Sequence, residues 1–176
     1  GKMFAFRFVM AVGMVCFIGV PSAAAENATA VISGTKEGSA VSGTATFTDS
    51  PEGLHVVIQV AGVSPGQHGL HIHQYGRCED TGKAAGGHYN PEGVKHGFLP
   101  TDGFTQAHAG DFGNIEIRGD GVGTLELTIP GLRVSGGSHT VGGRSVVLHE
   151  QIDDFGQPTG NAGGRIGCGV IVITGD

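Results

Sequence analysis

The sequence predicts an all-β fold, a sandwich or flattened barrel of about eight strands. Apolar and polar residues alternate in several short runs, and 34 glycines among 176 residues fall between those runs without a fixed period. This combination is typical of short strands joined by tight turns. In addition, no long segment repeats its apolar residues at the helical period of about 3.6.

The clearest strands are two runs, 54–60 and 125–129, in which every second residue is apolar. One face of each strand should be buried and the other solvated, because successive side chains point to opposite faces. Further strands are expected at 28–33, 41–48, 69–73, 115–118, 145–148 and 170–174. Two long loops rich in glycine, 74–112 and 150–167, are predicted between them.

Residues 1–25 predict a signal peptide that is removed. Lys2 and Arg7 precede the apolar run 8–20, and small residues follow it. The apolar run is shorter than the roughly 20 residues that cross a bilayer, so a retained anchor is the less favoured alternative. We therefore expect one exported domain, residues 26–176, that lies in a periplasm or outside the cell and has no membrane attachment after cleavage.

The charge of the chain does not favour nucleic acid as a partner. The formal net charge is −6, and it becomes −8 when Lys2 and Arg7 are lost with the signal peptide. The remaining basic residues are scattered along the sequence, whereas proteins that bind polyanions cluster them.

Histidines occur at spacings that suggest metal binding. His71 and His73 are two apart in a predicted strand and should point to the same face, and a turn can bring His108 and Asp111 together. An all-imidazole set suits copper, and imidazoles with one carboxylate suit zinc. Six histidines and one aspartate in five segments thus look like two metal sites that share a ligand. The set is His71, His73, His88, His96, His108, Asp111 and His149.

These segments resemble the copper,zinc superoxide dismutase family, and they occur in the order of that family. The matching blocks are 69–73, 86–91, 95–97, 108–114, 147–150 and 160–170. Any single block would be weak, but so many in the right order make coincidence improbable. The resemblance implies an eight-stranded antiparallel Greek-key sandwich or flattened barrel with two long functional loops.

The resemblance also implies the metal ligands. Copper would be bound by His71, His73, His88 and His149, and zinc by His88, His96, His108 and Asp111. His88 would bridge the two metals and also transfer a proton. Asp153 would contact the rings of both His71 and His96 from outside the two sites. Such a contact orients a ligand ring through the nitrogen that does not bind metal.

Arg165 takes the place of the family's anion-guiding arginine, with Thr159 beside it. By the same resemblance, and because paired cysteines in exported proteins are usually oxidised, Cys78 and Cys168 should form a disulfide. Only residues 155–159 separate Asp154 from Gly160, whereas many relatives have a longer, charged loop here, so we expect Arg165 to contribute an unusually large share of substrate attraction.

The implied function is dismutation of superoxide to oxygen and hydrogen peroxide. A non-catalytic exported copper- and zinc-binding module is the alternative, and an adhesion-type β-sandwich with incidental histidines is a third. His68 is expected to have a structural role, while His55 and His139 carry no signal of metal binding. A homodimer is left open, because Gly142 and Gly143 stand where dimeric relatives have a bulkier apolar residue.

Overall fold

The computed structural model describes residues 1–3 and 25–175. The signal peptide predicted for residues 1–25 therefore lies almost wholly outside the described residues. Within the described part of the chain, no helix has the length and apolar character needed to cross a membrane.

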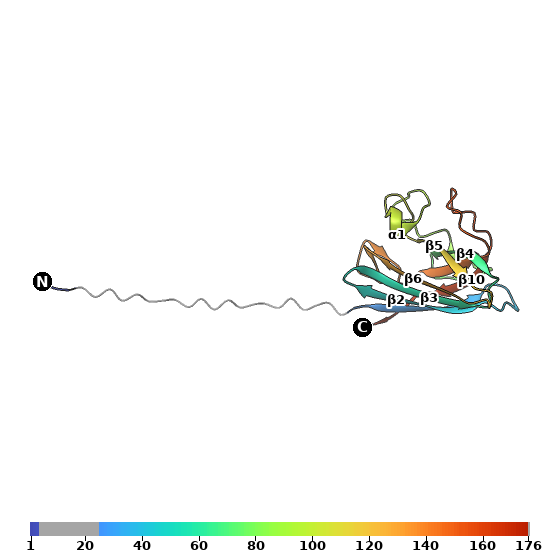
Figure 1. Cartoon of the computed structure of the whole chain (residues 1–176), viewed down its shortest axis with the longest axis horizontal. Coiled ribbons are helices and arrows are strands. Elements are labelled where there is room, and N and C mark those ends of the chain that lie inside the picture. Colours follow the sequence, from blue (N-terminus) through green and yellow to red (C-terminus); the bar gives the residue numbers. More distant parts are fainter. Residues whose placement is uncertain (4–24, 176) are drawn as a thin grey trace.

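Eight antiparallel strands form a closed barrel, which confirms the all-β prediction (Figure 1). In the order of their pairing they are β1 (Asn27–Gly34), β2 (Ser42–Ser50), β3 (Gly53–Ala61), β6 (Gly123–Ile129), β5 (Asp111–Ile117), β4 (Gly66–His73), β9 (Ser145–His149) and β10 (Arg165–Val170). The pairing of β10 with β1 closes the barrel, and β11 (Val172–Gly175) adds a further strand beside β1. The short elements are β7 (Leu132–Arg133), β8 (His139–Thr140), the 3-10 helix η1 (Lys83–Ala85) and the helix α1 (Leu99–Asp102).

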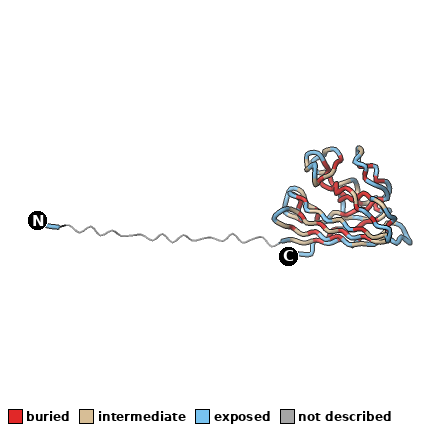
Figure 2. The backbone as a smooth tube through the Cα atoms, viewed as in Figure 1, coloured by how far each residue is buried: buried red, intermediate tan, exposed pale blue. Residues whose placement is uncertain are grey.

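Buried residues alternate with less buried ones along the strands (Figure 2), and the buried side chains fill the barrel interior. In β2 and β3 every second residue is buried, and Ile58 lies opposite Ala45 and Leu125 in the two neighbouring strands. Phe47 and Phe112 are among the largest side chains that are fully buried. Each such side chain contributes about 1.5–3 kcal/mol of burial free energy, so this core supports the loops above it.

Two strand boundaries differ from the sequence prediction. β10 begins at Arg165, inside the predicted loop 150–167, and the predicted strand 170–174 is divided between β10 and β11. Glycine hides the strand pattern here, because a Cβ on Gly169 would lie 2.5 Å from the carbonyl oxygen of Val31. A position where two backbones approach so closely cannot carry the apolar side chain that alternation needs.

The two long connections rise from the same side of the barrel, over β4 and its neighbours (Figure 1). The first joins β4 to β5 and contains η1 and α1, and the second joins β9 to β10. β4 pairs with β5 on one side and β9 on the other, so the residues of β4 lie beneath both connections.

Candidate metal centre

The structure brings together all seven residues that the sequence singled out, in two groups. The first group is His71, His73, His88 and His149, and the second is His88, His96, His108 and Asp111. Within each group the candidate ligand atoms lie within 4.8 Å of one another, so each group could hold one metal ion. His88 belongs to both groups.

The strands β4 and β9 build the first group. His71 and His73 lie two residues apart on β4, and His149 ends β9. His73 Nδ1 donates to the carbonyl oxygen of Gly86 at 2.9 Å, and this leaves its Nε2 atom 3.3 Å from His149 Nε2. His71 Nδ1 is buried and has no hydrogen-bond partner among the described residues. Three ring nitrogens are thus available on one side of the group.

Asp111 organises the second group. Its Oδ2 atom accepts hydrogen bonds from the backbone N–H groups of Gly97 at 2.9 Å and His108 at 2.8 Å, which fixes the carboxylate. Its Oδ1 atom lies 3.0 Å from His88 Nδ1. His96 Nδ1 lies 2.9 Å from Asp111 Oδ2 without forming a hydrogen bond, so that nitrogen is also unsatisfied.

Asp153 connects the two groups from outside. Its Oδ2 atom lies 2.7 Å from His71 Nε2, its Oδ1 atom lies 2.9 Å from His96 Nε2, and all three side chains are buried. Each ring therefore uses Nε2 for the carboxylate and keeps Nδ1 for its group. Gly160 makes this approach possible, because a Cβ at this position would overlap Asp153 Oδ1.

Burial keeps most of the candidate ligands neutral. It lowers the pKa of His73 to about 2, of His149 to about 3 and of His88 to about 4, so their lone pairs are free at neutral pH. Burial also lowers the pKa of His96, but the carboxylates of Asp111 and Asp153 outweigh it and raise that pKa to about 9. A metal binding to the second group would have to displace this proton.

The two carboxylates remain ionised. Burial raises the pKa of Asp111, but the neighbouring rings of His108, His88 and His96 outweigh it and hold the pKa far below its usual value. The pKa of Asp153 is lowered in the same way by His71 and His96. The second group thus combines imidazoles with a permanent negative charge.

The unsatisfied nitrogens test whether metal ions fit these groups. A buried polar atom without a partner costs about 1–3 kcal/mol, yet His71 and His96 each present such an atom to one of the groups. Four imidazoles form a donor set suited to copper, and three imidazoles with one carboxylate form a set suited to zinc. The residues therefore fit one copper and one zinc ion.

A pocket of about 250 Å³ lies beside the first group and contains Arg165. Lys36, Lys83 and Glu150 also line it, together with Gly163, whose carbonyl oxygen lies 3.3 Å from His149 Nδ1. Sequence reasoning missed the two lysines, because no spacing links them to the histidines. Thr159, expected beside Arg165, is exposed and does not line this pocket.

The loop between β4 and β5 holds Arg165 in place. The guanidinium group donates to the carbonyl oxygens of Gly82 and Gly86, each at 2.6 Å, and partial burial lowers its pKa. The expected disulfide between Cys78 and Cys168 is present and ties this loop to β10 across 90 residues of sequence. The disulfide, the loop and Arg165 thus form one connected unit.

The remaining histidines among the described residues lie outside both groups. His68 places one ring nitrogen 2.8 Å from the carbonyl oxygen of His149 and the other 2.8 Å from that of Ser64, which agrees with a structural role. His55 pairs with Glu126 at 2.8 Å on the outer face of the barrel. His139 pairs with Glu92 at 2.8 Å and stacks on Phe104.

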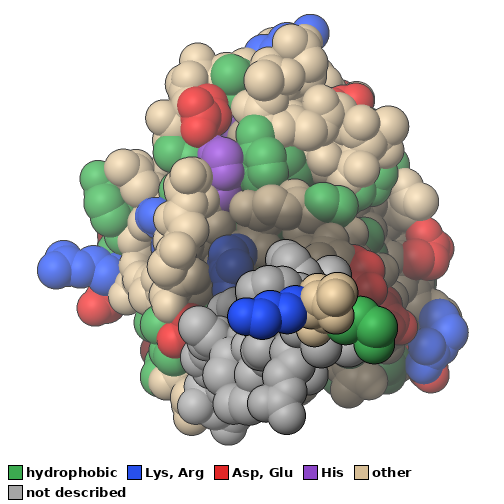
Figure 3. Space-filling view, turned by 90° about the vertical axis from the view of Figure 1, so that its left-hand side faces the viewer, with side chains coloured by type: hydrophobic (Ala, Val, Ile, Leu, Met, Phe, Trp, Pro, Cys, Tyr) green, Lys and Arg blue, Asp and Glu red, His purple; other side chains and the backbone are tan. Residues whose placement is uncertain are grey.

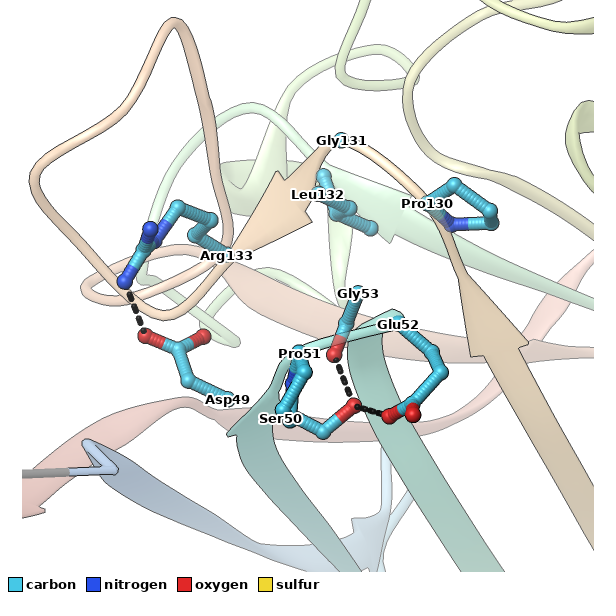
Figure 4. A pocket seen from close by; sticks show the side chains of 9 residues that line it. All are labelled: Asp49, Ser50, Pro51, Glu52, Gly53, Pro130, Gly131, Leu132 and Arg133. Carbon is cyan, nitrogen blue, oxygen red and sulfur yellow. Dashed lines mark hydrogen bonds and ion pairs between the residues drawn. The ribbon is translucent and has the colours of Figure 1, made fainter. Parts of the chain in front are cut away.

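A second pocket in the described part of the chain lacks such chemistry. A second pocket, between the turns that follow β2 and β6, contains the ion pair of Arg133 and Asp49 at 3.4 Å but no histidine or cysteine (Figure 4). On the end of the molecule seen in Figure 3, Lys and Arg side chains stand apart with Asp and Glu among them.

The protein is thus a closed antiparallel β-barrel with a candidate binuclear metal centre, because its two histidine groups share one residue. The family described as copper/zinc superoxide dismutase matches residues 41–171, and the chain belongs to this family. A solved structure, described as the crystal structure of the clock protein EA4, is 38% identical, with a TM-score of 0.73, and the match covers 84% of this chain and 94% of that one.

Proposed function

We propose that this protein is a superoxide dismutase that binds copper in the first group and zinc in the second. The observation that supports the proposal is the first group, in which four imidazoles lie together and one of them, His149, is paired with Arg165 across β9 and β10. When bound, copper alternates between two oxidation states and takes an electron from one superoxide before giving it to the next, while zinc is redox-inert. Two superoxides and two protons thus give oxygen and hydrogen peroxide.

The chain contributes attraction for the substrate. Lys36, Lys83 and Arg165 supply three positive charges to one pocket, against one negative charge from Glu150. This local surplus opposes the formal net charge of −6, and it acts within the roughly 8–10 Å that salt leaves unscreened. Lys36 and Lys83 would share this role with Arg165, and the large share predicted for Arg165 stays a prediction.

His88 is assigned to proton transfer as well as metal binding. Its ring lies 4.0 Å from the ring of His71, and its Nδ1 atom lies 3.0 Å from Asp111 Oδ1, so it faces both groups. The pKa of about 4 leaves the ring neutral at pH 7. An imidazole that takes up a proton and returns it to the reduced substrate acts as a general acid.

Metal analysis combined with a superoxide assay tests the proposal. We expect one copper and one zinc ion per chain, together with superoxide consumption measured by pulse radiolysis. His149→Gln should lose copper and activity but retain zinc, since His149 belongs only to the first group. His139→Gln, outside both groups, is the matched control. A parent protein that holds both metals and consumes no superoxide would contradict the proposal.

A non-catalytic metal-binding module is the second candidate. The observation in its favour is that the similar structure is described as a clock protein. In that case the chain would bind zinc, or both metals, without consuming superoxide. The same assay therefore separates the two functions.

We also propose that residues 1–25 are removed and that residues 26–176 work outside the cytoplasm, in a periplasm or extracellularly. The Cys78–Cys168 disulfide supports export, because such bonds persist in oxidising compartments. N-terminal sequencing of the protein recovered from culture medium or periplasm should begin near Glu26. A cytoplasmic protein that retains the N-terminal segment would contradict this proposal.

We propose that the protein forms a homodimer through exposed apolar side chains on β1 and β11, next to the pairing of β1 with β10 that closes the barrel. Val31 on β1 is 73% exposed, and Val172 and Ile173 on β11 are 57% and 43% exposed. Ile173 packs directly against Gly142, where a Cβ would lie 2.9 Å from Ile173 Cδ1, and the glycine adds no bulk to this face. Light scattering should give twice the chain mass, and Val172→Lys should reduce it to one. A parent protein that is monomeric at micromolar concentration would refute the dimer.

A further inference from the structure

The backbone of His96, a candidate ligand of the second group, is held by a side chain that is distant in sequence. His96 lies between η1 and α1, outside any helix or strand. Among the described residues its backbone makes no hydrogen bond to another backbone group. The side chain of Gln157, 61 residues later, bonds it instead.

Gln157 satisfies both backbone groups of His96. Its Oε1 atom accepts the His96 N–H at 3.0 Å, and its Nε2 atom donates to the His96 carbonyl oxygen at 2.9 Å. An amide side chain can do this because it carries a donor and an acceptor side by side. A carboxylate of the same length would keep one bond and lose the other.

Phe155 approaches the same histidine from the side of its ring. The two rings are nearly parallel, at 18°, with centroids 6.3 Å apart, and Phe155 also meets the edge of Phe98 at 5.9 Å. Its backbone N–H donates to Asp153 Oδ1 at 2.8 Å. Phe155 has a φ of 59°, which is strained for a large side chain, and it is still 43% exposed. Such a conformation persists only where neighbouring contacts hold it.

We infer that the short segment 155–157 positions the zinc ligand His96, with Gln157 fixing its backbone and Phe155 covering its ring. This inference rests on the proposed zinc site. Asp153 and Asp111 lie against the ring of His96, and Asp111 also accepts the N–H of Gly97, the next residue. Among the described residues, however, only Gln157 bonds the backbone N–H and carbonyl oxygen of His96 itself. Without Gln157 the loop that carries His96 would be free to move and would take the histidine with it. Gln157 is therefore a positioning residue that slows the loss of zinc.

The test is the rate of zinc release from the copper- and zinc-loaded mature chain, followed with a chromogenic chelator. Gln157→Met keeps the length of the side chain but has no amide, and it should release zinc roughly 10-fold faster, since two hydrogen bonds are lost. Gln157→Glu should fall between Met and the parent. Gln151→Met is the matched control, because Gln151 is exposed in the same loop and its side chain makes no hydrogen bond to a described residue.

A spectroscopic measurement separates positioning from loop stability. With cobalt(II) in place of zinc, the visible absorption reports the ligand geometry, and Gln157→Met should change this spectrum. Copper affinity and the melting temperature of the metal-free protein should stay at parental values. Zinc release at the parental rate would overturn the inference alone. A lower melting temperature with equal losses of copper and zinc would overturn it too. A parent protein that binds no zinc would overturn both this inference and the proposed metal site.

Discussion

Replacing Asp153 with Asn should weaken binding of both metals while leaving the barrel folded. The carboxylate accepts from His71 Nε2 at 2.7 Å and from His96 Nε2 at 2.9 Å. Asn offers one acceptor oxygen and one NH₂ group, so one of the two rings would face a donor instead of an acceptor. That ring would lose the partner that fixes its orientation.

The magnitude follows from the bond that is lost. A hydrogen bond to a charged group contributes about 1.5–3 kcal/mol, and about 1.4 kcal/mol corresponds to a tenfold change in affinity. We therefore expect a loss of roughly 10- to 100-fold in metal affinity. The backbone of residue 153 is held separately by Asn114, whose side chain bonds its N–H at 2.7 Å and its carbonyl oxygen at 2.9 Å. The melting temperature of the metal-free protein should accordingly change little.

Competitive chelator titration of parent and variant measures the effect for copper and zinc separately. Asp154→Asn is the control, because Asp154 is the exposed neighbour and, among the described residues, its side chain bonds only Asn161 and the N–H of Gly156. Affinities of Asp153→Asn that equal those of the parent would show that this carboxylate does not orient the two rings. A similar loss in Asp154→Asn would show that the effect belongs to the loop as a whole.

Three further predictions concern charge, oxidation and pH. Arg165→Ile should lower the second-order rate with superoxide severalfold to roughly 10-fold and flatten the decrease of that rate with salt, while the copper content stays unchanged. Lys83→Gln should have a smaller effect, and pulse radiolysis at several ionic strengths measures both variants. A parental rate that rises with salt would mean that the negative net charge dominates. Reduction of the Cys78–Cys168 disulfide should speed zinc extraction before circular dichroism shows unfolding, because the disulfide ties a loop to β10 while the core strands pair independently. Two free thiols in the unreduced protein would contradict this prediction. The metal-free protein should lose stability as pH falls below 6.5, because the pKa values of His73, His88 and His149 are lowered to about 2, 4 and 3 and the unfolded chain then binds more protons than the folded one. The free energy of unfolding should fall by about 1 kcal/mol per histidine between pH 6.5 and 5.5. A denaturant midpoint that does not change over this range would refute the prediction.

The sequence was a good guide to the strands whose two faces differ. In β3 the alternation from residue 54 to residue 60 matches the burial pattern, because one face of the strand packs in the barrel and the other meets solvent. The same reasoning fails at β10, where Gly167 and Gly169 are buried and leave no apolar pattern to follow. Close packing of backbones thus removes the signal that periodicity depends on.

For the site, the histidines were found because chemically distinctive residues recur at recognisable spacings. Lys36 and Lys83 were missed because an exposed lysine is common, and only the fold brings the turn after β1 to the pocket of Arg165. Gln157 was missed for a similar reason. Its partner is the backbone of His96, and backbone groups leave no trace in the identity of a residue.

The seam between β1 and β10 sets the order in which the barrel can be completed. Ser33 faces Cys168, 135 positions later in the chain, so the edge of β1 that does not pair with β2 stays open until β10 has been made. Contacts so far apart in sequence make folding slow and leave strand edges unpaired in the meantime. Cys168 lies on that closing strand. A newly made chain therefore has an interval in which it is open, reduced and prone to aggregation, and this interval ends when the last strand arrives.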